Sequence, residues 1–279
     1  MSFTQLSPRP VEKLWGRRAL PPPFESVPDD AEPVGEIHFE SASLDHPELL
    51  VKYLFTSQDL SIQVHPDNAA AQRAGLPHGK DEAWYILDAD EGASIALGLK
   101  HPATIDQLRQ ASLDGSVVDL MDWRPVHKGD ILYAPAGTVH AIGAGISVVE
   151  VQQNLDLTYR LYDYGRDRPL QLEESLAVAR SEPAAPNPIS VAIDSRRTLL
   201  CAGPNLTFER WTGPATLPLR LADGDAVWVI ALDEGVSVEG EPLSAGSVVV
   251  VQSRTSVSLA EGATALITYP SRIPLTIAA

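Results

Sequence analysis

The sequence predicts a mainly β protein with two antiparallel barrel or sandwich domains and a few short helices. Twenty-three prolines and nineteen glycines are spread along the 279 residues, and short β-branched runs lie between them. Such spacing is typical of all-β sandwiches and barrels. A second observation is an internal repeat, in which the C-terminal part resembles the N-terminal part but lacks its metal-binding residue types.

Four runs in the N-terminal part predict strands, because each is rich in apolar and β-branched residues and is bounded by turn residues. They are VKYLF (51–55), AWYIL (83–87), DILYAP (130–135) and ISVVEVQ (146–152). Helical signals are few. Thr104 and Gln107 form a capping box, which predicts one helix over 104–122 or two short helices joined at Gly115. A further helix is expected near 169–181.

The segment PAAPNP (183–188) reads as a linker, so we expect a catalytic domain over 1–182 and a C-terminal domain over 183–279. The repeat supports this division. DEAWYILDADEGASIALG (81–98) resembles DAVWVIALDEGVSVEG (225–240), with Trp84 matched to Trp228, and GDILYAPAGTVH (129–140) resembles GSVVVVQSRTSV (246–257). In this alignment Glu82 becomes Ala226 and His140 becomes Val257. The second copy therefore has a structural role, packing against the first domain or covering its edges.

Composition restricts the partners and the compartment. With 37 acidic and 21 basic residues the net charge is −16, which disfavours nucleic acid or an anionic membrane as a partner. An anionic small-molecule substrate would need a local basic pocket. Cys201 is the single cysteine, and no stretch approaches the roughly 20 apolar residues of a membrane-spanning helix. Because the first residues carry prolines and charges instead of an apolar signal sequence, we expect cytoplasmic residence. The chain is expected to act as a monomer or a homodimer.

Four candidate metal ligands lie in glycine- and proline-punctuated strand segments. In LSIQVHPD (60–67) the spacing of Gln63 and His65 puts both side chains on one face of an extended strand. Glu82 follows in GKDEAWYIL, and His140 ends a segment in which proline and glycine shape a close backbone approach. Two imidazoles and two oxygen donors suit Zn²⁺, Mn²⁺, Fe²⁺ or Co²⁺ and leave room for water or substrate. The pattern predicts a catalytic metal.

These segments resemble the type I phosphomannose isomerases of the cupin superfamily. The resemblance rests on VEKLWG (11–16), GEI (35–37), LSIQVHPDN (60–68), GKDEAWYIL (79–87), PAGTVHAIGAG (135–145) and VQQNLDLTYRLYDYGR (151–166). It implies two cupin-type (jelly-roll) domains, the second degenerate, and one Zn²⁺ per chain on Gln63, His65, Glu82 and His140. It also implies a zinc-dependent aldose–ketose isomerase that interconverts mannose 6-phosphate and fructose 6-phosphate through a cis-enediol. WGRR (15–18) departs from the family's usual W-G-G.

The resemblance also implies three catalytic residues: Arg160, Lys80 and Asp156. Lys80 would share a strand face with Glu82 and carry the proton, and Arg160 would stabilise the enediolate. Asp156, four residues before Arg160, would share its face on an extended strand and orient it or assist ring opening. Simpler interpretations remain open, because Lys80 also fits a solvated loop and Arg160 a surface ion pair. Lys52 and Arg17 are candidates for the phosphate.

Two other functions fit the same ligands. An Fe²⁺ dioxygenase of the cupin superfamily also uses a His/Glu set with open positions, although such enzymes commonly have a histidine where Gln63 stands. A non-enzymatic sugar-phosphate-binding protein with a structural metal is the second alternative. Iron content with oxygen uptake would indicate the first, and binding without turnover would indicate the second.

Overall fold

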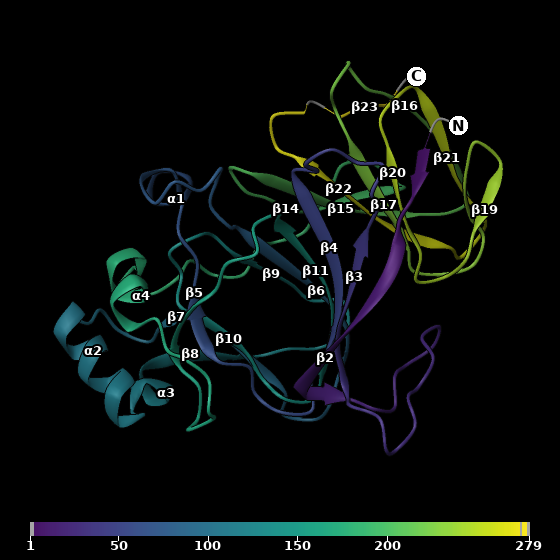
Figure 1. The fold of residues 1–279 in the computed structure, drawn as a ribbon. Coiled ribbons are helices and arrows are strands. Elements are labelled where there is room, and N and C mark those ends of the chain that lie inside the picture. The colour runs from purple at the N-terminus through teal and green to yellow at the C-terminus, as the bar shows by residue number, and fades with distance from the viewer. Residues whose placement is uncertain (1–2, 274, 278–279) are drawn as a thin grey trace.

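The computed structural model describes residues 3–273 and 275–277, which form 23 strands and four short helices. Two β-sheet units lie side by side, and the helices gather at the end of the first unit that points away from the second (Figure 1). Each unit consists of two antiparallel sheets. Among the described residues, no helix combines the length and apolarity needed to cross a membrane.

The first unit, called the first barrel below, contains a six-stranded and a five-stranded sheet. The six-stranded sheet has the order β2 (Ser7–Arg17), β3 (Val34–Glu40), β4 (Leu49–Phe55), β11 (Ile146–Gln153), β6 (Glu82–Ala89) and β9 (Ile131–Ala134). The five-stranded sheet has the order β12 (Tyr159–Tyr162), β5 (Ile62–Val64), β10 (His140–Ile142), β7 (Ser94–Leu99) and β8 (Met121–Pro125). Each of the four predicted strand runs overlaps a strand of the first sheet.

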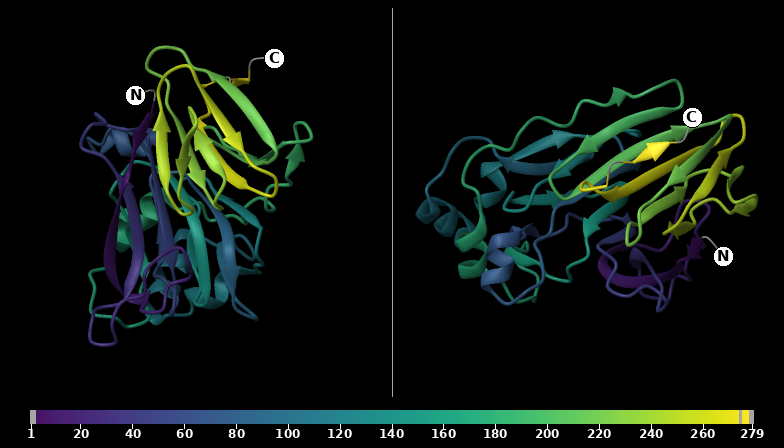
Figure 2. Two further views of the ribbon diagram at one scale, coloured as in Figure 1. Left: turned by 90° about the vertical axis from the view of Figure 1, so that its right-hand side faces the viewer. Right: turned by 90° about the horizontal axis from the view of Figure 1, so that it is seen from above.

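The second unit, the second barrel, lies over the first barrel's large sheet (Figure 2). Its seven-stranded sheet has the order β1 (Phe3–Gln5), β20 (Val248–Val251), β17 (Val227–Ala231), β22 (Thr264–Pro270), β15 (Leu206–Thr212), β14 (Arg197–Ala202) and β13 (Val191–Ala192). Its five-stranded sheet has the order β19 (Glu241–Leu243), β18 (Val236–Val238), β21 (Thr255–Leu259), β16 (Ala215–Arg220) and β23 (Thr276–Ile277). Strand β1 joins this barrel from the other end of the sequence.

The four helices are α1 (Asn68–Arg73), α2 (Ile105–Asp114), α3 (Val117–Leu120) and α4 (Leu172–Val178). Thr104 and Gln107 make both bonds of the capping box at the start of α2. Gly115 ends α2 in the left-handed conformation at φ 86°, which separates it from α3 as the second of the two expected arrangements requires. Helix α4 is shorter than expected, because Gln171 bonds the backbone of Arg160 instead of entering the helix.

The two large sheets pack face to face and share one apolar core. Phe39 and Tyr53 from the first barrel lie in the same cluster as Phe208 and Trp228 from the second, and all four are at most 3% exposed. Burial of one such side chain contributes about 1.5–3 kcal/mol. The two barrels are therefore held together as one body, while the boundary at residues 182 and 183 stays a prediction.

The alignment of Trp84 with Trp228 is wrong in register. Trp84 packs inside the first barrel with Ile86, whereas Trp228 faces outward into the core shared by the two barrels. In the second barrel the inward positions of β17 belong to Val227 and Val229. A shift of one residue along a strand reverses the face of every side chain, and a sequence alignment with matched tryptophans does not detect it.

Candidate metal centre

The four candidate ligands meet between the two sheets of the first barrel. Gln63 on β5 and His140 on β10 are directly opposite each other in the five-stranded sheet. His65 follows β5 by one residue, on the same side as Gln63, and Glu82 is the first residue of β6 in the opposing sheet. Gln63 is half-buried, and the other three are at most 2% exposed.

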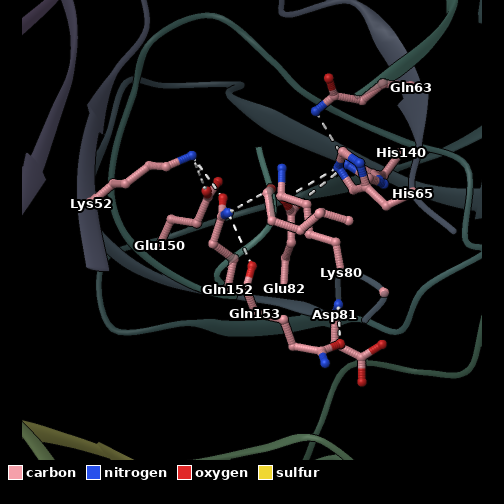
Figure 3. Close-up of polar contacts among 12 residues, drawn as sticks. Lys52, Gln63, His65, Lys80, Asp81, Glu82, His140, Glu150, Gln152 and Gln153 are labelled. Atoms are coloured by element: carbon pink, nitrogen blue, oxygen red, sulfur yellow. Dashed lines mark hydrogen bonds and ion pairs between the residues drawn. The ribbon is translucent and has the colours of Figure 1, made fainter. Parts of the chain in front are cut away.

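The donor atoms converge on one point (Figure 3). The two carboxylate oxygens of Glu82 lie 3.2 Å from His65 Nε2 and 3.3 Å from His140 Nε2. The amide of Gln63 lies 3.3 Å from His140 Nε2, and rotation of this amide by half a turn would present its oxygen instead. One donor atom from each of His65, Glu82 and His140 lies within 4.8 Å of the others, a spacing that one metal ion can bridge.

The chemistry of these donors fits a metal ion. Both ring nitrogens of His65 and Oε2 of Glu82 are buried without a hydrogen-bond partner among the described residues, an arrangement that is costly unless a ligand satisfies it. His140 Nδ1 lies 2.9 Å from the carbonyl oxygen of Thr138. Donation to this carbonyl leaves the lone pair of Nε2 facing the other ligands, as is usual for a metal-binding histidine.

Local electrostatics keep the ligands in the forms that bind metal. Burial, with the nearby Lys80 cation, lowers the pKa of His65 to about 3, so its imidazole is neutral at pH 7. Burial alone would raise the pKa of Glu82, but the nearby Lys80 cation holds it well below its usual range. Lys80 Nζ lies 2.9 Å from Glu82 Oε1, and Lys80 is itself 5% exposed. The lysine thus sits beside the ligands and not in a solvated loop.

Gly137 makes the close backbone approach that the sequence indicated. Its N–H donates to the carbonyl of His65 at 2.8 Å, and its φ is 86°, a conformation that glycine adopts without strain. A Cβ at this position would lie 3.1 Å from both Arg180 and the carbonyl of Val178. The turn before His140 is therefore tied directly to the segment that carries His65.

A cavity beside the ligands is lined by more cations than acids, although the whole chain is strongly acidic. The cations are Lys13, Lys52, Lys80, Arg160 and Arg168, and the acids are Glu36, Glu82 and Glu150. Four of these cations have a carboxylate partner in an ion pair. The side chain of Arg160 has none among the described residues, and its buried Nε makes no hydrogen bond. The cavity therefore presents an unpaired guanidinium to an incoming ligand.

Asp156 and Arg17 lie outside this cavity. The expectation that Asp156 shares a strand face with Arg160 is wrong, because residues 154–158 lie outside any strand and Asp156 is exposed. Arg17 lines a different surface hollow, where it bonds the carbonyl of Thr56 and approaches Asp90. Neither residue reaches the ligands.

Sequence reasoning overlooked the acid that pairs with Lys52. Lys52 and Glu150 are opposite each other on β4 and β11, with Nζ 3.1 Å from Oε1, and Lys52 also donates to Gln152 at 2.7 Å. Trp84 donates to the other oxygen of Glu150 at 3.2 Å. Burial lowers the pKa of Lys52, but the carboxylates of Glu150 and Glu36 outweigh it and raise the pKa. The sequence did carry a signal for this pair, because Lys52 and Glu150 are the single charged residues of the apolar runs VKYLF and ISVVEVQ.

Curated relatives of the chain are named mannose-6-phosphate isomerases. The Streptococcus mutans protein is 41% identical over 172 residues, which cover 58% of this chain and 54% of the relative. ManA from Bacillus subtilis is 43% identical over 142 residues, which cover 48% of this chain and 44% of the relative. The chain thus spans about half the length of the curated relatives it matches. No family model matches it.

Solved structures confirm the predicted fold. The mannose 6-phosphate isomerase from Bacillus subtilis has a TM-score of 0.80 at 24% identity, over 96% of this chain and 99% of its own. A zinc-bound mannose 6-phosphate isomerase has a TM-score of 0.71 at 13% identity, over 97% of this chain and 100% of its own. In sequence over about half its length, and in fold over nearly all of it, the chain resembles mannose-6-phosphate isomerases.

Proposed function

We propose that the protein is a zinc-dependent aldose–ketose isomerase that interconverts mannose 6-phosphate and fructose 6-phosphate. The observation that carries the proposal is the adjacency of two features. The buried donor set of His65, Glu82 and His140 adjoins a cavity with excess cationic side chains, in which Arg160 is unpaired. A metal-binding set beside an anion-binding wall suits a sugar phosphate, and the curated relatives carry the name of this activity.

The donor set supports Zn²⁺, one per chain. Two imidazole nitrogens and one carboxylate leave a position that the Gln63 amide oxygen, water or substrate can take, as in catalytic zinc sites. When bound, the metal supplies Lewis-acid stabilisation of charge on the substrate oxygens near C1 and C2. The second barrel contributes no comparable group of histidines and acids among its described residues.

The reaction moves a proton between C2 of the aldose and C1 of the ketose through a cis-enediol. We propose that Lys80 carries this proton, because its side-chain nitrogen lies at the ligands and lines the cavity. The neutral amine would take the proton from one carbon, and the ammonium group so formed would return it to the other. Arg160 stabilises the negative charge that develops on the enediolate oxygens, since among the described residues no carboxylate forms an ion pair with its guanidinium group. Lys52 is less suited to binding the substrate phosphate, because its ammonium group already donates hydrogen bonds to Glu150 and Gln152.

An assay for fructose 6-phosphate tests the proposal. Purified protein is supplied with mannose 6-phosphate, before and after treatment with a chelator, and metal content is measured on the same sample. We expect turnover that is lost on chelation and restored by Zn²⁺. Absence of product from a zinc-loaded sample would refute the isomerase assignment. Iron in the purified protein with substrate-dependent oxygen uptake would favour a dioxygenase, and sugar-phosphate binding without turnover would favour a binding protein.

A further inference from the structure

The residue between Lys80 and Glu82 in the sequence, Asp81, carries a buried carboxylate. Asp81 is 2% exposed. Because neighbouring side chains of an extended segment alternate in direction, Asp81 points away from the ligands and toward the second barrel. Its carboxylate accepts three hydrogen bonds, from the Tyr133 hydroxyl at 2.5 Å, the Asn205 amide at 2.8 Å and the Ala136 N–H at 2.8 Å.

One of these donors belongs to the second barrel. Asn205 lies in the turn between β14 and β15, and it is half-buried. Its side-chain oxygen accepts from Asn68 Nδ2 at 3.1 Å, while Asn68 Oδ1 accepts from the N–H of Gly79 at 2.8 Å. Asn205 is thus connected to Gly79 through Asn68, and it bonds Asp81 directly.

The same network includes the other ligand-bearing segments. Ala136 belongs to the turn before His140, and the N–H of Lys80 donates to the carbonyl of Pro66, next to His65. The Gln153 side chain accepts from the N–H of Asp81 at 3.0 Å (Figure 3). Lys80 and Asp81 together therefore connect the segments of all three buried ligands.

The turn that carries Asn205 packs closely against Tyr133, which bonds Asp81. A Cβ on Gly203 would lie 2.0 Å from the Tyr133 hydroxyl, so glycine lets the turn approach Tyr133 and brings Asn205 to Asp81. Burial and the Asp81 carboxylate raise the pKa of Tyr133, so its hydroxyl stays protonated and remains a donor.

We propose that Asn205 and Asp81 form an inter-barrel latch that positions Lys80 and Glu82. The second barrel, which lacks the ligand set, then determines the geometry of the metal site through one turn. In its catalytic consequences this inference rests on the proposed function. Its structural consequence, a fixed 79–82 segment, does not depend on any reaction. Asn205, Asp81 and Tyr133 are positioning residues, since they contact the ligand-bearing segments and not the substrate.

Two substitutions of Asn205 test the latch. Asn205→Ala removes the donor, and Asn205→Asp places a second carboxylate beside Asp81, so the second change should have the larger effect. In the metal-free protein we expect faster amide hydrogen exchange at residues 80–82. In the zinc-loaded protein we expect affinity for Zn²⁺ to fall about 10–100-fold, the usual effect of losing a group that orients a ligand. We further expect kcat to fall while KM stays within about twofold.

A matched control removes another contact between the barrels. Arg272 of the second barrel bonds Glu48 of the first at 2.5 Å, and both side chains are exposed. Arg272→Ala should leave exchange at residues 80–82, zinc affinity and kcat unchanged. Wild-type values of all three for both Asn205 variants, or equal losses in Arg272→Ala, would overturn the latch. If the wild-type protein shows no isomerase activity, the exchange and zinc measurements still decide the point.

Discussion

His140 and Gln63 are directly opposite each other on β10 and β5, and the Gln63 amide lies 3.3 Å from His140 Nε2. The next strand, β12, extends this row, because Arg160 is opposite Gln63 on its other side. Side chains that are directly opposite on neighbouring strands share a face of the sheet. The five-stranded sheet therefore carries ligands and an unpaired cation side by side, and Glu82 from the other sheet completes the donor set.

Loss of His140 should remove the metal. His140→Ala deletes one of three buried donors, and the remaining pair no longer encloses the ion. We expect less than stoichiometric Zn²⁺ by elemental analysis and no measurable isomerase activity. His127→Ala is the control, because His127 is exposed and does not belong to the converging group of donors. Full zinc occupancy in His140→Ala would remove His140 from the site.

Loss of Arg160 should separate metal binding from turnover. Arg160 is not one of the converging donors, and its Nε makes no hydrogen bond within the described part of the chain, so Arg160→Ala should keep one Zn²⁺ per chain. Removal of a group that stabilises developing charge typically lowers kcat about 10²–10³-fold. Steady-state kinetics and metal analysis on one preparation measure both effects. Arg160→Lys, which keeps the charge, should recover part of the rate, and full activity in Arg160→Ala would exclude a catalytic role.

The convergence of the candidate metal ligands could be predicted from sequence because their signals are local. Gln63 and His65 are two residues apart in one short segment, and the glycine and proline before His140 define a tight turn within another. The lysine beside Glu82 follows from the same alternation of strand faces. Expectations failed where the local conformation was assumed. Asp156 would share a face with Arg160 only on a continuous strand, and the chain leaves the sheet before β12.

Contacts that depend on register between distant strands could not be predicted. Lys52 and Glu150 are separated by 98 residues, and their pairing depends on how β4 and β11 align. Asn205 reaches Asp81 across 124 residues through a turn whose sequence, GPN, carries no functional signature. The mismatch of Trp84 and Trp228 has the same cause. Local motifs thus predicted which candidate ligands come together, while the groups that support them depended on the tertiary fold.

Loss of Glu150 should destabilise the protein more than loss of a surface acid. Glu150→Ala leaves the buried Lys52 without its nearest carboxylate and frees the Trp84 N–H. Removing one partner of a buried ion pair typically costs about 3 kcal/mol or more. The exposed Arg9–Glu40 pair supplies the control, and Glu40→Ala should cost less than about 1 kcal/mol. Urea unfolding of both variants measures the difference, and equal losses would contradict a stabilising role for the buried pair.

The stability of the metal-free protein should fall as the pH is lowered from about 6.5. Burial lowers the pKa of His65 to about 3 from an ordinary value of 6.5, so the unfolded chain binds this proton first. Between these values the unfolded state holds more protons, and the free energy of unfolding decreases as pH falls. Below about 4.5 the lowered pKa of Glu82 adds a loss of the same sign. One proton corresponds to a slope of about 1.4 kcal/mol per pH unit.

Urea unfolding of chelator-treated protein at pH 7, 6 and 5 measures this slope. His65→Asn removes the titrating group but keeps a polar side chain of similar size, so its free energy of unfolding should change less between pH 6.5 and 5. His127→Asn, at an exposed position, should keep the wild-type slope. Identical slopes in wild type and His65→Asn would show that the buried imidazole is not the group that titrates. Bound Zn²⁺ should not reduce the slope, because the metal also keeps the imidazole unprotonated in the folded state while the unfolded chain still takes up the proton.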